Sequence, residues 1–151
     1  STDGYRVLTY KSEDIGDLLR SDIRLIIKAH GCINDARSMV FTKAQYHKAK
    51  KDYPQFYEIL KAIFLTHTCI FIGCSMDDPD ILLALEEVKI TSSSTFPHYV
   101  LTREGDNTEL AKNDWNKTYN IRALEYGPNH SDLNVDLKDL NEKITEFRAI
   151  Y

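Results

Sequence analysis

The sequence predicts an α/β protein with a mainly parallel sheet and helices on its faces. From about residue 20 onward, short apolar stretches typical of strands alternate with stretches of helical periodicity, and this alternation produces βαβ crossovers. The stretch Asp22–Ala29 is apolar from Ile23 to Ile27 apart from Arg24. Such a run is typical of a strand buried on both faces, as in parallel sheets.

The predicted strands are short and rich in β-branched or aromatic residues. They cover Tyr5–Thr9, Asp22–Ala29, Thr68–Ile72, His98–Thr102 and Ile121–Tyr126, with a further extended stretch at Ser38–Phe41. We expect Thr68–Ile72 to be a central strand, because it is strongly apolar and is followed at once by Gly73.

The predicted helices begin at residues that suit helix N-termini. They run from Ser12 to Leu19, from Thr42 past Ala49, from Pro54 to Leu65, from Asp78 to Val88, from Asn107 or Thr108 to Trp115, and from Leu133 to Phe147, with a Ser/Thr-rich loop at Thr91–Thr95. In Pro54–Leu65 the apolar residues recur at a spacing of three and four, which predicts an amphipathic helix packed on a sheet.

Composition limits the function classes. The 151 residues fit one ordinary domain, and a formal net charge of −4 argues against a broad nucleic-acid-binding face. The three cysteines follow no CxxC spacing, so neither a disulfide framework nor a zinc site is indicated, and a reducing cytoplasm is the simplest location. No apolar stretch reaches the roughly 20 residues of a membrane span.

Two predicted loops follow strand ends, where open parallel sheets bind ligands. In the first, His30 leaves the end of a buried strand and Gly31 permits a sharp turn. The imidazole is suited to act as a general base near neutral pH. A hydrogen-bonded structural histidine is the alternative, and the residues alone favour it.

The second loop, Gly73 to Pro79, joins a strand directly to a helix. Gly73 allows a nucleotide close to the backbone, Ser75 offers a hydroxyl, and the helix start offers free N–H groups. Because Asp77 and Asp78 would repel a phosphate, ribose hydroxyls are the better partners. A plain strand-to-helix turn is the alternative, and Cys74 is better explained as a small buried residue than as a nucleophile.

These motifs also occur in a recognisable order. Lys28–Gly31 is followed by Val40–Thr42 with Tyr46, then by the helix Phe56–Phe64, then by Phe71–Ile81. The set resembles the sirtuin-like domains of bacterial proteins, a family that includes NAD-hydrolysing effectors of anti-phage defence. The resemblance implies a Rossmann-like, mainly parallel sheet with helices on both faces.

The resemblance also implies roles for particular residues. His30 would be the catalytic base toward the nicotinamide ribose or an attacking water. The residues expected to bind NAD, which is the substrate, are Gly31, Gly73, Cys74, Ser75, Asp77 and Thr102, with Gly73 and Ser75 on the adenosine side. Thr102 and Arg103 stand where deacetylating sirtuins carry an Asn and Glu pair. No metal is expected, because the histidines show neither HxxxH nor HxH spacing.

The zinc-binding Cys quartet of the protein deacetylases is absent from these 151 residues, which disfavours a protein-deacetylase role. The family's Gly-rich phosphate loop and its T-x-N-x-D segment, which should precede this chain, are not found in it either. We therefore expect residues 1–151 to be a single segment, the later part of a sirtuin-like domain, and nearly inactive in isolation.

The hypothesis that follows is that the parent protein hydrolyses NAD to nicotinamide and ADP-ribose, in anti-phage defence and in the cytoplasm. The alternative is a non-catalytic module that binds NAD or ADP-ribose or another protein. Deacylation and ADP-ribosyl transfer are weaker options. Expected partners are NAD, other domains of the parent protein and further copies in a homo-oligomer, with neither nucleic acid nor membrane.

Overall fold

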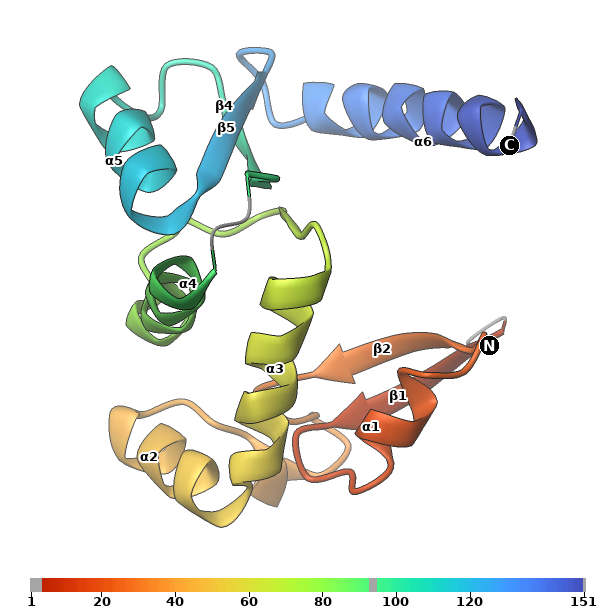
Figure 1. Ribbon diagram of the computed structural model, residues 1–151, viewed down its shortest axis with the longest axis vertical. Helices are drawn as coiled ribbons and strands as arrows, with labels where there is room; N and C mark the ends of the chain where they lie inside the picture. The colour runs from red at the N-terminus through yellow and green to blue at the C-terminus, as the bar shows by residue number, and fades with distance from the viewer. Residues whose placement is uncertain (1–3, 93–94, 151) are drawn as a thin grey trace. The chain divides into compact units, whose positions relative to one another are not determined.

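The computed structural model describes residues 4–92 and 95–150, and the chain divides into two compact units, Ser1–Ile63 and Phe64–Tyr151 (Figure 1). Every pairing between the named strands is parallel in the described residues, and helices connect the strands. The predicted α/β class is therefore confirmed. Ser93 and Ser94 of the predicted loop Thr91–Thr95 lie outside the described residues.

In the first unit, β1 (Tyr5–Thr9) pairs in parallel with β2 (Arg24–Lys28), and α1 (Ile15–Leu18) lies in the connection between them (Figure 1). The register runs from Tyr5 opposite Arg24 to Thr9 opposite Lys28. The expectation that β2 is buried on both faces is wrong, since Ile26 keeps 43% of its surface exposed. Leu25 and Ile27, on the other face, pack on the core.

The first unit continues with η1 (Ala36–Ser38), α2 (Lys43–Asp52) and α3 (Pro54–Thr66). The stretch Ser38–Phe41 is predicted to be extended. Met39 is extended, but Ser38 is the last residue of η1. Thr42 caps α2 as predicted, and Pro54 begins α3.

An aromatic-rich core holds the first unit together. Its buried residues come from β1, α1, α2, α3 and the segment after β1, and they are Leu8, Tyr10, Ile15, Ala49, Phe56 and Tyr57. The rings of Tyr10 and Tyr53 meet edge to face with centroids 5.3 Å apart, the arrangement that the ring quadrupoles favour. This core anchors the β1–α1–β2 crossover, and with it the end of β2.

The second unit contains a three-stranded parallel sheet in the order β3 (Ile70–Phe71), β4 (His98–Arg103), β5 (Ile121–Tyr126). The expectation that Thr68–Ile72 forms a central strand is wrong in the described structure: β3 is a short edge strand, and β4 is the strand with a partner on each side. Val100 in β4 and Ile121 in β5 are almost fully buried.

Three helices belong to this unit: α4 (Pro79–Thr91), α5 (Glu109–Tyr119) and α6 (Asp132–Ile150). α4 and α5 pack against each other, and α5 packs on β5. Leu85 of α4 is buried, and Thr108 caps α5 by accepting from the Ala111 N–H at 3.2 Å. α6 follows β5 and extends away from the strands (Figure 1).

Within the described residues, none of the helices combines the length and the apolar character that crossing a bilayer requires.

Candidate functional site

The carboxyl ends of β3, β4 and β5 lie at one edge of the second unit's sheet, because the strands are parallel. A pocket of about 650 Å³ at this edge is lined by residues of the β3–α4 turn, the end of β4, α5, and the start of α6 with the turn before it. It brings together the predicted residues Gly73, Cys74, Ser75, Asp77 and Thr102. This is the position at which open parallel sheets bind ligands.

The turn after β3 has two left-handed residues. Gly73 has φ of +68° with no atom within 4 Å of the position a Cβ would take, so its backbone is open to a ligand. Met76 has φ of +58° and a buried side chain. The carboxylate of Asp78 accepts from the Ile81 N–H at 3.4 Å and caps α4, as predicted. Cys74 is exposed, so its interpretation as a small buried residue is wrong.

At the end of β4, two polar pairs line the same pocket. The Oγ1 of Thr102 accepts from Nδ2 of Asn107 at 2.5 Å. Arg103 donates to a single oxygen, Oδ1 of Asp106, from both Nε (3.0 Å) and Nη2 (2.6 Å). The hydrogen bond from Arg103 lowers the pKa of Asp106 and keeps its carboxyl ionised.

A further pair follows β5. The hydroxyl of Tyr126 and Nδ1 of His130 are 3.0 Å apart, and both residues line the pocket together with Trp115. Asp106, Asn107 and Tyr126 line the pocket but are not predicted from the sequence as site residues. Only their positions in the sequence could have indicated them, because each lies at or just after the end of a predicted strand or before a predicted helix.

His30 and Gly31 lie in the first unit, at the turn that follows β2. The His30 side chain is exposed, and its carbonyl accepts from the Val40 N–H at 3.1 Å. Gly31 has φ of +84°, and a Cβ there would lie 2.2 Å from the carbonyl oxygen of Ser38. Close packing therefore requires glycine at position 31, independently of any ligand.

The segment after Gly31 folds back on itself through Ser38, which is 1% exposed. Its Oγ accepts from the Cys32 N–H at 3.0 Å and donates to the Asp35 carbonyl at 2.7 Å. Lys28 donates from Nζ to the Cys32 sulfur at 3.0 Å, and this hydrogen bond is the main reason that the pKa of the Cys32 thiol is lowered. These bonds order the loop beside His30 and leave its imidazole at the surface.

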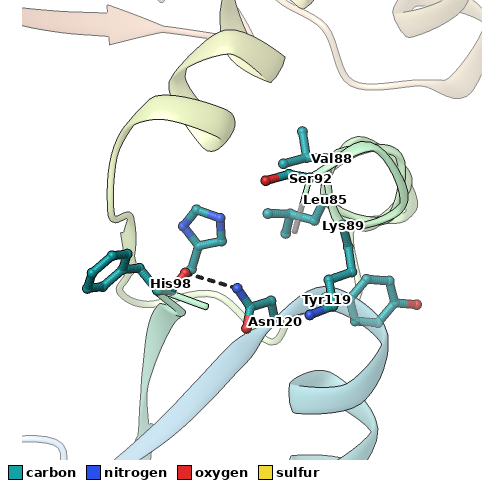
Figure 2. A pocket seen from close by; sticks show the side chains of 8 residues that line it. Leu85, Val88, Lys89, Ser92, His98, Tyr119 and Asn120 are labelled. Carbon is teal, nitrogen blue, oxygen red and sulfur yellow. Dashed lines mark hydrogen bonds between the residues drawn. The ribbon is translucent and has the colours of Figure 1, made fainter. Parts of the chain in front are cut away.

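A second, much smaller pocket lies at the opposite end of β4 (Figure 2). His98 at the start of β4, Leu85 and Lys89 of α4, and Asn120 after α5 line it, and Asn120 donates to the Phe96 carbonyl at 2.9 Å. Its volume of about 20 Å³ suffices for roughly one water molecule. It is therefore too small for a nucleotide.

No group of three or more His, Cys, Asp or Glu side chains in the described ranges is placed to hold a metal ion. The expectation that the protein uses no metal stays a prediction.

Two comparisons with known proteins bear on this geometry. Residues 2–124 match the SIR2-like domain family. Over 82 residues the chain is 35% identical to a protein of Enterococcus faecium named NAD(+) hydrolase ThsA, and that alignment covers 53% of this chain and 17% of the relative. The family match covers most of the chain and confirms the resemblance to sirtuin-like domains. The chain belongs to the SIR2-like domain family.

Proposed function

We propose that this chain is part of a protein that hydrolyses NAD to nicotinamide and ADP-ribose, and that the 650 Å³ pocket of the second unit receives the adenosine side of NAD. The observation that carries the proposal is the convergence of Gly73, Ser75 and Thr102 on one pocket at the carboxyl ends of parallel strands. The printed name of the Enterococcus faecium relative, an NAD(+) hydrolase, supports this reaction.

The residues of the pocket suit a nucleoside better than a diphosphate. Asp77 and Asp106 line it, and the single Arg103 is already paired with Asp106. Carboxylates accept hydrogen bonds from ribose hydroxyls and repel phosphate oxygens. The diphosphate contacts then fall to the Gly-rich loop that the family carries and these 151 residues do not. We accordingly keep the proposal that residues 1–151 form the later part of the domain.

In the proposed reaction, water attacks the anomeric carbon of the nicotinamide ribose and the bond to the nicotinamide nitrogen breaks. Nicotinamide leaves as a neutral molecule, because the positively charged ring nitrogen takes the bonding electron pair. One proton is released, and we assign its removal from the water or from a ribose hydroxyl to His30. The His30 imidazole is exposed at the turn that follows β2. We place this activity in the cytoplasm and in anti-phage defence.

The test uses the full-length protein and the fluorescence of an etheno-NAD analogue. A general base contributes about 10²- to 10⁴-fold to rate, so His30→Ala should lower kcat by at least about a hundredfold. His47→Ala is the matched control, since His47 is an exposed histidine on α2, and it should keep the wild-type rate. Unchanged turnover in His30→Ala would remove His30 from catalysis.

The same assay separates hydrolysis from the main alternative. A wild-type protein that binds NAD in calorimetry and releases no nicotinamide would be a non-catalytic nucleotide-binding module.

A further inference from the structure

The first unit contains a pocket of about 400 Å³ that the proposed reaction does not use. It is lined by residues 10–13 after β1, by Ile15 of α1, and by residues 52–56 with Ile59, where α2 ends and α3 begins. None of these residues lines the 650 Å³ pocket of the second unit. The volume lies within the range of about 300–1,000 Å³ that is usual for small-molecule sites.

Three aromatic rings form the apolar side of this pocket. Tyr10 meets Tyr53 edge to face with ring centroids 5.3 Å apart, and it meets Phe56 with centroids 6.4 Å apart. Tyr10 and Phe56 are each 5% exposed, and Ile15 of the same core is 1% exposed. Because these side chains are packed in the core, this wall is formed before any ligand binds. A flat aromatic ligand suits it, since aromatic rings pack favourably on one another.

The hydroxyl of Tyr10 is a polar group within this aromatic wall. It makes no hydrogen bond within residues 4–92 and 95–150. Every fully enclosed side-chain nitrogen or oxygen in those ranges has a partner, so the Tyr10 hydroxyl is not fully enclosed. Since Tyr10 is otherwise buried and lines the pocket, we place its hydroxyl at the pocket. There it offers an O–H donor to a ligand.

The start of α3 supplies a second donor. Pro54 is the first residue of α3, so the N–H of Gln55 lies in the first turn, where the helix itself provides no acceptor. In the described chain this N–H makes no hydrogen bond with another residue. Both residues line the pocket. The start of a helix also carries a partial positive charge.

Three charged side chains line the pocket, and two of them have partners. Lys11 pairs with Asp35 at 3.9 Å. Asp52 pairs with Lys48 at 2.8 Å. Glu13 is exposed and forms neither an ion pair nor a hydrogen bond with any described residue. Its carboxylate repels an anion and accepts from an N–H donor, while the start of α3 disfavours a cation. The pocket therefore favours an uncharged ligand that both accepts and donates hydrogen bonds.

We infer that this pocket binds an uncharged nucleobase such as adenine. The fused rings lie against the aromatic wall, ring nitrogens accept from the Tyr10 hydroxyl and the Gln55 N–H, and the exocyclic amino group donates to the Glu13 carboxylate. The inference is independent of the proposed function, because the 650 Å³ pocket of the second unit shares none of these residues.

The experiment measures the Kd of adenine for the full-length protein by calorimetry. Purine is the ligand control, because it has the same fused rings and lacks the exocyclic amino group. We expect adenine to bind about tenfold more tightly than purine, since a hydrogen bond to a charged group contributes about that factor or more. Glu13→Ala should raise the Kd of adenine about tenfold and leave that of purine unchanged.

Tyr10→Phe keeps the ring and removes the hydroxyl, so the Kd values of adenine and purine should both rise about three- to tenfold. Tyr5→Phe is its matched control, since Tyr5 is exposed on β1 and does not line the pocket. Glu142→Ala is the control for Glu13→Ala, because Glu142 is an exposed glutamate on α6. Both controls should keep the wild-type Kd values, and thermal melting checks that every variant is folded.

Thr102→Ala distinguishes the two pockets, because Thr102 lines the pocket of the second unit and not this one. Adenine binding that is weakened by Thr102→Ala, and unchanged by Tyr10→Phe and Glu13→Ala, would assign the base to the second unit and overturn this inference.

Two further results would also overturn it. They are a wild-type protein that does not bind adenine, and one that binds adenine and purine equally. Neither result touches NAD hydrolysis, which the etheno-NAD assay measures separately. If Tyr10→Phe fails to fold, Glu13→Ala decides the question, because Glu13 is exposed and its loss leaves the core intact.

Discussion

Gly31, Gly73 and Gly105 all have a positive φ, but the space around their α-carbons differs. At Gly73 and Gly105 the space beside the α-carbon is open, whereas at Gly31 it is filled by the backbone of Ser38. The conformation alone costs an ordinary residue about 1–3 kcal/mol. Only at Gly31, among these three, does a steric clash with backbone atoms add to that cost.

Gly31→Ala should therefore destabilise the protein by clearly more than Gly105→Ala. We expect about 1–3 kcal/mol for Gly105→Ala from the left-handed conformation, and a larger loss for Gly31→Ala because its Cβ would lie 2.2 Å from the Ser38 oxygen. The free energy of unfolding from urea titration measures both. Equal losses would show that the Ser38 loop moves aside without cost.

At the scale of a single element, α2 begins with a capping box. The hydroxyl of Thr42 accepts from the Gln45 N–H at 3.2 Å, and Oε1 of Gln45 accepts from the Thr42 N–H at 3.1 Å. Gln45 also accepts from the Phe41 N–H at 2.9 Å. This capping box satisfies backbone donors that a helix leaves without partners at its start.

We expect Thr42→Ala to lower the free energy of unfolding by about 1 kcal/mol, the usual contribution of an N-cap hydroxyl. Thr42→Ser keeps the hydroxyl and is the matched control, with a change close to zero. Circular dichroism during urea unfolding gives both values. A loss as large for the Ser variant as for the Ala variant would mean that the threonine methyl group, and not the cap, stabilises this turn.

At the scale of the whole molecule, His98 connects several elements of the second unit. Its Nδ1 accepts from the Cys69 N–H at 3.1 Å, and its ring packs edge to face on Phe64 and Phe71. The residue is buried, and burial lowers the pKa of its imidazole below the usual 6.5. The folded protein therefore disfavours the protonated form of His98.

Stability should consequently fall as the solution is acidified. The unfolded chain binds a proton on His98 as the pH drops through about 6.5, while the folded protein resists it, so this contribution is full above that pH and is lost below it. Between about pH 7.5 and 5.5 we expect the free energy of unfolding of the wild type to decrease more than that of His98→Gln. Urea titrations at each pH measure the difference.

His47→Gln serves as the control for this comparison, because His47 is exposed on α2. Its stability should follow the wild-type dependence on pH. A His98→Gln variant that follows it as well would show that His98 does not couple folding to pH.

The features that the sequence alone determined are those that depend on residues close together in the chain. β1, β5 and the starts of α2, α3 and α4 lie where the sequence predicts them, because strand patterning and caps depend on residues a few positions apart. The family, which the comparisons confirm, was also readable from the order of the motifs. The turns after β2 and β3 were recognisable as candidate sites from strand ends and glycines.

Only the tertiary structure decided which of these residues meet. Gly73, Thr102 and His130 are far apart in the chain, and parallel pairing of β3, β4 and β5 brings the ends of those strands to one pocket. The central place of β4 and the packing of Gly31 on Ser38 depend in the same way on contacts between separate segments. Such contacts leave no periodic signal in the sequence, because they are set by the pairing of strands and the close packing of backbones.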